Sequence, residues 1–360
     1  MRAELSTLDI KALAEEMQFL AGARIDRIYN SSGLDIIFQL HSKEGKQFLI
    51  ISKKFFYICA EKKEIPQIPS EFCKTLRRHL EKKRIKEIRQ HESERIVVIS
   101  AENNDLVVEF FGQANIILCG KDKMIITSAR IQASGNIVKP KAKYGFPEKG
   151  ANVFKLKEKE FAEIIKNSKT EIVKTVASLV GGVYAEEICL RAGMDKNKKS
   201  PDDSEIKRLF SAFGSLLREQ TAPAVVYENS KIRDAVPFEL KIYENFTKVA
   251  FSNFYEALDF ALRESGGQAR ETEALKRYSK QIEKIHEIIS SQKKQLETLK
   301  KEHGENKRAG ELIYENYGEL KNLVSQFEDA KKKMSLPEIK SKITNKKIVS
   351  IENSKIVVDL

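Results

Sequence analysis

A long apolar seam in the C-terminal third of the chain places the strongest constraint on its fold. Apolar residues recur there at spacings of three and four over about four heptads, and only Gln292 breaks the series. The seam consists of Leu275, Tyr278, Ile282, Ile285, Ile289, Leu296 and Leu299. It predicts a coiled-coil arm that begins near Glu271, because apolar a and d positions bury against a partner helix. We expect the seam to pair with the same seam of a second copy or to fray.

The end of the chain is expected to differ from this arm. Gly304 and Asn306 are expected to interrupt the first helix, and a second helical stretch follows them up to the Lys331–Lys333 run. The last residues, from 347 to 360, alternate in hydrophobicity around an Asn-Ser pair, which predicts a β-hairpin. Because an isolated hairpin is marginal in water, we interpret residues 336–360 as the start of a small middle domain that is truncated here.

The first 150 residues contain short runs of β-forming residues separated by turn signals, together with helices over Leu8–Leu20 and from about Ser70 to Leu80. This pattern predicts an α+β fold built on antiparallel sheet. A helical period follows, then a small strand–helix segment that ends at Gly266-Gly267. The predicted domains are residues 1–150 (antiparallel sheet), 151–267 (mainly helical), 268–335 (coiled-coil arm) and 336–360 (partial domain).

The charge of the chain favours a polyanionic partner. Lys and Arg number 64 against 52 Asp and Glu, which gives a net charge of +12. RNA, DNA or an anionic membrane surface would suit this balance, although many Lys-rich proteins bind nothing acidic. The N-terminus has no signal-peptide pattern and no stretch approaches the ~18 apolar residues of a membrane span. We therefore expect a cytoplasmic protein without a membrane partner.

Basic residues gather in clusters that could contact phosphate groups. The densest cluster includes Arg77, Arg78, Lys82 and Lys83 and extends to Arg89. Smaller clusters follow at Lys139, Lys141 and Lys143, at Lys196, Lys198 and Lys199, and from Lys331 to Lys347. Each cluster could equally be a solvated helix face.

Gly181-Gly182 lies between two helical stretches, where a glycine pair lets a phosphate approach the backbone at a helix start. An ordinary helix–helix turn is an equally good interpretation of a single glycine pair.

Catalytic and metal signatures are missing from the sequence. It contains no P-loop, no GxGxxG after a strand, no HExxH and no GxSxG. The four cysteines are far apart and lack CxxC spacing, which argues against a zinc ribbon and against a disulfide framework. We therefore expect a binding protein without a cofactor or a metal ion.

Six strings, occurring in one order, are more specific than these patterns. They are LDIKALAEEM…LAGARIDRIYN, LRRHLEKKRIKEIRQHESERIVVI, FFGQANIILCGKDKMIITSAR, VKPKAKYGFP, GGVYAEEICLRAG and RAGELIYENYGELKNLV. The chain resembles the NFACT family, which includes the bacterial RqcH proteins, the eukaryotic NEMF-type factor and proteins once labelled fibronectin-binding protein A. The resemblance covers essentially the whole chain, but the family's second arm helix and its C-terminal NFACT-R domain are not matched by any part of it.

The resemblance implies a role in ribosome-associated quality control. Family members bind a large ribosomal subunit that carries stalled peptidyl-tRNA and recruit a charged tRNA, and the nascent chain gains a C-terminal tail without mRNA. In prokaryotic members the tail is alanine, which implies alanine tRNA as a partner. The ribosome performs peptide transfer, so the resemblance implies no enzyme activity for the factor. It also implies a glycosylase-like N-terminal domain followed by a helix-hairpin-helix domain.

Several residues match the family's tRNA-binding positions. Asp9 falls on an acidic position of the first helix, and Glu94-Arg95 falls on an Asp-Arg pair, with Glu in place of Asp. Gly181-Gly182 matches the helix-hairpin-helix turn, although Leu179 replaces the usual earlier glycine. Arg24, Arg27 and Arg130 are predicted for the same tRNA-binding surface. Arg77, Arg78, Lys82, Lys83 and the glycine pair are predicted to contact the nucleic-acid backbone.

Three other functions compete with this interpretation. A formamidopyrimidine-type DNA glycosylase would need an N-terminal proline amine and zinc cysteines, whereas this chain begins Met1-Arg2-Ala3-Glu4. An adhesin would need secretion, and a coiled-coil scaffold would not bind tRNA.

Overall fold

The computed structural model describes residues 4–30, 35–59, 68–133, 136–147, 151–342, 348–352 and 355–359. The chain divides into two compact units, Met1–Arg270 and Glu271–Leu360, and each is described by itself.

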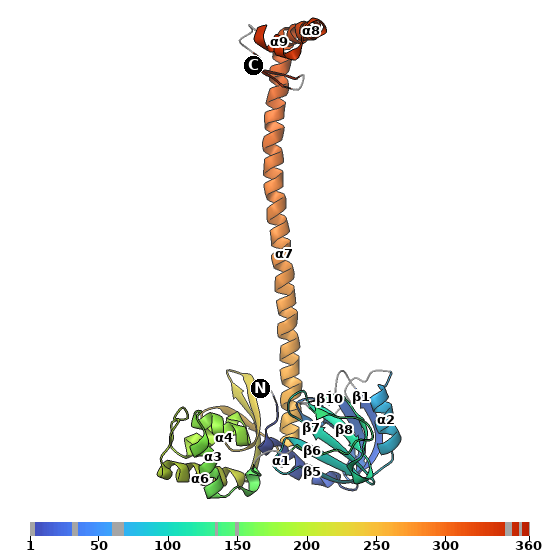
Figure 1. The fold of residues 1–360 in the computed structure, drawn as a ribbon, viewed down its shortest axis with the longest axis vertical. Helices are drawn as coiled ribbons and strands as arrows, with labels where there is room; N and C mark the ends of the chain where they lie inside the picture. Colours follow the sequence, from blue (N-terminus) through green and yellow to red (C-terminus); the bar gives the residue numbers. More distant parts are fainter. Residues whose placement is uncertain are drawn as a thin grey trace. The chain divides into compact units, whose positions relative to one another are not determined.

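The first unit begins with a capped helix and two antiparallel sheets (Figure 1). Helix α1 (Thr7–Glu16) continues as a 3₁₀ turn, η1 (Met17–Leu20). The first sheet has the order β1-β2-β3-β4, and the second has the order β5-β6-β7-β8-β9. Helix α2 (Glu71–Leu80) connects them. The strands are β1 (Arg24–Asn30), β2 (Ile36–Ser42), β3 (Gly45–Ile51), β4 (Phe56–Cys59), β5 (Ile85–Gln90), β6 (Ile96–Ala101), β7 (Asn104–Glu109), β8 (Asn115–Cys119) and β9 (Ile125–Ser128).

Every neighbouring pair in these two sheets is antiparallel. The predicted α+β class with antiparallel sheet is therefore confirmed. The likeness to glycosylases and the helix-hairpin-helix assignment stay predictions.

Helices and a third sheet complete this unit. The helices are α3 (Glu158–Asn167), α4 (Ile172–Val180), α5 (Gly182–Arg191) and α6 (Asp203–Leu217). The third sheet has the order β13-β12-β14, from β12 (Thr221–Glu228), β13 (Lys231–Phe238) and β14 (Thr247–Ala250). Helix α1 contacts β5, β6, α4 and β13, so it joins the strand-rich part to the helical part.

One large apolar core extends through both parts of this unit. It includes side chains of α1 such as Leu8 and Leu13, the inward faces of the two large sheets, and Phe161 and Phe213 of α3 and α6. Each such side chain contributes about 1.5–3 kcal/mol on burial. A smaller apolar cluster lies on the second sheet, where Tyr144 packs with residues of β6 to β9. The four cysteines are buried as free thiols.

Helix α7 (Phe254–Glu315) corrects two predictions about the arm. It begins at Phe254, where the carboxylate of Glu16 accepts hydrogen bonds from the backbone N–H groups of Phe254 and Tyr255 at 2.8 and 3.2 Å. It runs unbroken through Gly266-Gly267 and through Gly304 and Asn306, where the sequence predicted an end and an interruption. Glycine inside a helix costs only about 1 kcal/mol relative to alanine, so the helix formers around these positions decide the outcome.

The second unit contains the rest of α7, then α8 (Tyr317–Lys333), α9 (Leu336–Lys342) and the antiparallel hairpin β15 (Ile348–Glu352) and β16 (Lys355–Val358). The hairpin is confirmed. Of the predicted seam, Leu275, Tyr278 and Ile282 lie outside the residues whose side chains the structure describes. Ile285, Ile289, Leu296 and Leu299 are exposed. Pairing of the seam therefore stays a prediction.

Candidate nucleic-acid interface

Two residue pairs, one predicted for tRNA binding and one for contact with a nucleic-acid backbone, line one cavity of about 1120 Å³. Glu94 and Arg95 lie just before β6, and Gly181 and Gly182 lie at the α4–α5 junction. All four residues line this cavity. Glu4 to Thr7, at the start of α1, and the α3 residues Glu160, Glu163, Ile164 and Asn167 also line it.

A hydrogen-bonded junction behind this cavity fixes its geometry. Ser6 caps α1 in a capping box: the Asp9 carboxylate accepts from the Ser6 backbone N–H at 2.8 Å, and Ser6 Oγ accepts from the Asp9 backbone N–H at 3.4 Å. The other oxygen of Asp9 accepts from the hydroxyl of Tyr184 at 2.5 Å. The acid at this position therefore ties α1 to α5.

Gly181 is required by this junction. It ends α4 and begins α5 with φ +95°, and a Cβ there would lie 2.8 Å from the Cβ of Ser6. Only glycine combines that backbone conformation with so close an approach. A Cβ at Gly182, in contrast, would meet nothing within 4 Å, so Gly182 is the member of the pair with open space around it.

The guanidinium of Arg95 is oriented at the cavity wall. Its Nη1 donates to Glu4 Oε1 at 2.6 Å, and the side chain is 30% exposed. The segment that holds it is bonded to α1: Gln90 Nε2 donates to the carbonyl of Glu94 and to Thr7 Oγ1, both at 2.8 Å. Arg95 is thus a positioned donor rather than a freely moving surface charge.

Among the described residues that line the cavity, carboxylates outnumber cationic groups. Glu4, Glu94, Glu160 and Glu163 belong to this set, and Arg95 is its one cationic residue. Glu160 also caps α3, where it accepts from the Lys157 backbone N–H at 2.9 Å. Such a wall suits the edge of a nucleobase, which offers N–H donors to a carboxylate and acceptors to a guanidinium, better than it suits a phosphate.

The structure separates the other predicted residues from this cavity. Asp9 is fully buried, so any effect it has on a ligand is indirect, through Ser6 and Tyr184. Arg24 pairs with Asp26 at 2.7 Å, and Arg130 Nη1 donates to Gln113 at 3.0 Å. Arg24, Arg27 and Arg130 are not among the residues that line the cavity. The assignment of these three arginines to the tRNA-binding surface stays a prediction.

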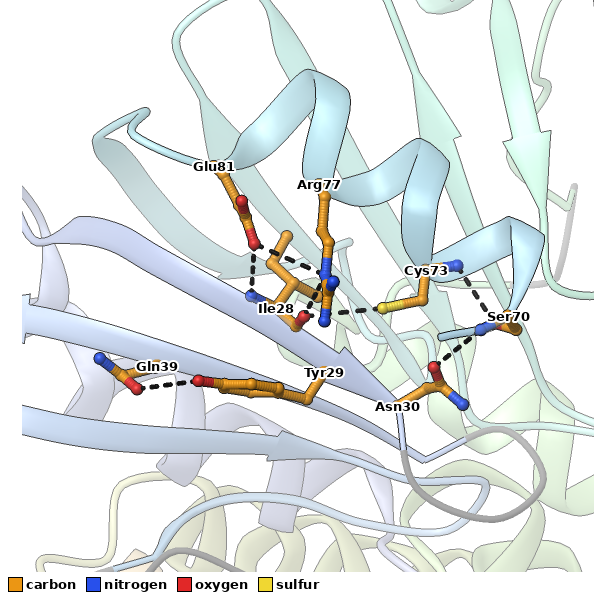
Figure 2. A network of polar contacts seen from close by, with 8 residues as sticks. All are labelled: Ile28, Tyr29, Asn30, Gln39, Ser70, Cys73, Arg77 and Glu81. Carbon is orange, nitrogen blue, oxygen red and sulfur yellow. Dashed lines mark hydrogen bonds and ion pairs between the residues drawn. The ribbon is translucent and has the colours of Figure 1, made fainter. Parts of the chain in front are cut away.

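The residues at the end of α2 mainly support the fold (Figure 2). Arg77 Nε donates to the carbonyl of Ile28 at 2.7 Å, and Glu81 accepts from the Ile28 backbone N–H at 3.0 Å. Because β1 is the edge of its sheet, these side chains cover backbone groups that would otherwise be unpaired. Lys83 pairs with Glu102 at 2.7 Å. Arg78 and Lys82 are exposed. For these two residues, contact with a nucleic-acid backbone stays a prediction.

Sequence reasoning missed Ser6, Thr7 and Tyr184 as parts of this site. The spacing of Ser6 and Asp9 is a capping-box signature and could have revealed the first contact. Tyr184 carries no such signal, because its partner lies 175 positions away. Among the described residues, no group of three or more His, Cys, Asp or Glu could hold a metal ion. None of the described helices is both long and apolar enough to cross a membrane.

The fold of this body is shared with the N-terminal regions of bacterial proteins of known structure. The N-terminal region of the fibronectin/fibrinogen-binding protein from Streptococcus suis superposes with a TM-score of 0.59 at 20% identity, over 72% of this chain and 100% of that one. The fibrinogen-binding protein from Staphylococcus aureus gives 0.58 at 19% identity, over 71% of this chain and 97% of that one. At these identities the likeness establishes the fold alone.

The family follows from the sequence match. Residues 6–358 match the model described as NFACT N-terminal and middle domains, and the chain belongs to that family. Among its relatives, the archaeal Rqc2 homolog aRqcH of Methanocaldococcus jannaschii is 32% identical in an alignment of 374 residues that covers 96% of this chain and 55% of the relative. The Rqc2 homolog RqcH of Bacillus subtilis is 25% identical in an alignment of 330 residues that covers 84% of this chain and 55% of the relative. This chain therefore spans about half the length of these relatives.

Proposed function

We propose that this chain is the N-terminal and middle part of a ribosome-associated quality-control factor. It binds the large ribosomal subunit with its stalled peptidyl-tRNA and positions a further tRNA, so that the nascent chain is extended with alanine without a template. The support comes from relatives named Rqc2 or RqcH homologs and from a relative named ribosome quality control complex subunit 2 in Saccharomyces cerevisiae, 31% identical over 137 residues, 36% of this chain and 13% of the relative.

One structural observation carries the proposal for tRNA. Glu94-Arg95 and Gly181-Gly182, which match two separate family motifs, line the same cavity. Since the two pairs come from distant parts of the chain, their meeting is a property of the fold and not of local sequence. In this proposal the cavity receives a nucleobase of the tRNA.

The proposed role is binding without chemistry. Arg95, oriented by Glu4, donates to acceptors on the base edge, and the carboxylate of Glu94 accepts from an amino group. The longer side chain of Glu94 reaches further than Asp would, so the base lies further from the backbone of β6. Peptide transfer belongs to the ribosome.

Replacement of Arg95 tests this proposal. Arg95→Ala should reduce tRNA that co-purifies with the chain by about 10-fold or more, because a base-edge contact contributes roughly 1–3 kcal/mol. The midpoint of urea unfolding should stay within error, because Arg95 and Glu4 form a partly exposed pair. Arg95→Lys keeps the charge but lacks the planar fork, and should bind poorly as well.

A matched control makes the same change in net charge as Arg95→Ala. Arg233→Ala removes one positive charge from the exposed pair with Glu228, which is not part of the cavity wall, and should leave tRNA recovery unchanged. Equal recovery of tRNA with Arg95→Ala and the unmodified chain would contradict the proposal. Sequencing of the bound RNA then identifies the tRNA, and enrichment of alanine tRNA with large-subunit rRNA is the expected result.

A further inference from the structure

Five exposed lysines lie on, or directly after, two turns beside strand β9 of the second sheet. The first turn, η2 (Lys121–Lys123), joins β8 to β9. The second runs from Lys139 to Ala142 and is closed by a hydrogen bond from the Ala142 N–H to the Lys139 carbonyl at 3.2 Å. We call the following set the lysine platform: Lys121, Lys123, Lys139, Lys141 and Lys143.

Backbone hydrogen bonds join the two turns into one structural element. The Lys141 N–H donates to the Ile125 carbonyl, and the Ile125 N–H donates to the Ala142 carbonyl, both at 2.8 Å. The Tyr144 N–H donates to the Lys123 carbonyl, also at 2.8 Å. Lysines that are separated in sequence by up to 22 positions, as Lys121 and Lys143 are, therefore occupy one surface.

Aromatic side chains support this surface from below. The buried Tyr144 donates its hydroxyl to Glu109 at 2.8 Å, which anchors the second turn to β7. Phe146 stacks on His91 with ring centroids 3.6 Å apart, and Lys123 Nζ lies 4.8 Å from the centre of the same ring. Because His91 and Lys123 both contact the ring of Phe146, this ring is not proposed to stack with a nucleobase.

The charge of the lysine platform is not neutralised by the fold. No ion pair joins any of its five ammonium groups to a carboxylate of the described residues, and Asp122 is the single acidic residue within these two turns. Elsewhere in the body, Lys83 pairs with Glu102 and Lys196 with Glu186, at 2.7 and 2.9 Å. The platform is thus a concentration of available positive charge.

We propose that the lysine platform binds the sugar–phosphate backbone of RNA without reading its sequence. Lysine ammonium groups act as point charges for phosphate, and the platform supplies neither a planar guanidinium nor an exposed ring to recognise a base. The choice of RNA over DNA rests on the proposed function; the phosphate contact itself does not. The platform would supply affinity, whereas the cavity at Arg95 would supply selectivity.

The backbone of two platform lysines permits a clean test. Lys123 and Lys141 have φ of +60° and +69°, a conformation that asparagine tolerates better than most residues. The double variant Lys123→Asn/Lys141→Asn therefore removes two charges without straining the turns. Lys123→Arg/Lys141→Arg keeps both charges and serves as the conservative variant.

The measurement is the salt dependence of binding, with the full 360-residue chain, to tRNA and to polyuridylate. For the Asn variant, the slope of log K against log salt should become shallower by about 1.4, because each lost contact to a single strand contributes about 0.7. The Arg variant should keep the original slope. Lys174→Gln/Lys196→Gln, which removes two charges from ion pairs elsewhere, should also keep it.

The outcomes separate this inference from the proposed function. Equal slopes for the Asn variant and the unmodified chain would contradict RNA binding by the lysine platform. Binding of the chain to phosphatidylserine vesicles in place of RNA would contradict it as well. A shallower slope on both RNAs supports it. If Arg95→Ala binds tRNA normally while the Asn variant still shows the shallower slope, the proposed function fails and the platform stands.

Discussion

Two regions of the body are both rich in basic residues but differ in what their charges contact. The first region runs from the start of α2 to the end of β5 (Glu71–Gln90) and is called the α2–β5 region. In it, Arg77 donates a hydrogen bond to the backbone of β1 and Lys83 is paired with Glu102. In the lysine platform, five ammonium groups are exposed without a carboxylate partner among the described residues. The α2–β5 region has the higher density of Lys and Arg in the sequence. Density of charge along a chain therefore does not measure the charge that is available to a partner.

The difference has a geometric origin. Helix α2 lies beside the edge strand β1 (Figure 1), where unpaired backbone groups attract long polar side chains. The platform turns satisfy their backbone groups among themselves, so their side chains are left to the solvent.

Arg77→Ala should lower the free energy of unfolding by about 2 kcal/mol, because a charged hydrogen bond to the Ile28 carbonyl is lost. The variant also removes the 3.6 Å ion pair to Glu81. Urea unfolding followed by circular dichroism measures the change. Arg78→Ala is the matched control, since Arg78 is on the same helix but exposed, and its effect should stay within about 0.5 kcal/mol. Equal effects of the two variants would abolish the distinction drawn for the α2–β5 region.

Tyr144→Phe should cost about 1.5 kcal/mol, because the buried carboxyl of Glu109 loses its hydrogen-bond partner. This substitution removes the hydrogen bond that anchors the second turn and leaves the five lysines of the platform unchanged. The same unfolding measurement checks it, with Tyr227→Phe as a control from the third sheet, where the tyrosine is only half-buried. A neutral Tyr144→Phe would mean that apolar packing alone holds the second turn.

Much of the fold was predictable because many of its elements depend on short-range patterns in the sequence. The strand runs, the turns between them, the cap of α2 at Ser70 and the terminal hairpin all depend on residues near in sequence. The cap of α7 at Phe254 was not predictable in this way, because the carboxylate of Glu16 that supplies it is 238 positions away. Its continuation through Gly304 reflects the sum of many helix formers, which outweighs one unfavourable residue.

The candidate site was predictable in part for the same reason. Matching strings identified Glu94, Arg95 and the glycine pair, and the fold brings these four to one cavity. The strings could not reveal that Asp9 is buried or that Ser6 is the group that approaches Gly181. Burial and close approach depend on long-range packing, which a linear pattern does not contain.

The carboxyl of Glu109, which anchors the platform through Tyr144, makes a pH-dependent contribution to stability. Burial raises the pKa of Glu109 above its ordinary value of 4.5, although the hydrogen bond from Tyr144 opposes the shift. The folded state therefore binds the proton more tightly than the unfolded state does. This contribution to stability is fully present below pH 4.5 and is lost as pH rises through the raised pKa.

Glu109→Gln should remove this dependence, because an amide does not titrate and its oxygen can still accept from Tyr144. The free energy of unfolding of the variant, relative to the unmodified chain, should increase between pH 4.5 and pH 8. Urea titrations across that range measure it. Glu102→Gln, on the exposed partner of Lys83, should not reproduce the trend. A parallel pair of profiles for Glu109→Gln and the unmodified chain would show that the carboxyl is not shifted.

The smallest effect is expected for Lys141→Asn. The side chain is exposed and has no carboxylate partner among the described residues, so its loss should not destabilise the fold. The left-handed backbone at φ +69° favours asparagine over lysine, so the free energy of unfolding should rise, by no more than about 0.5 kcal/mol. Thermal unfolding measures this change, and Lys143→Asn, without a positive φ, is the control that should not gain. A loss of stability in Lys141→Asn would mean that this lysine supports the fold as Arg77 does, and the contrast between the two basic regions would disappear.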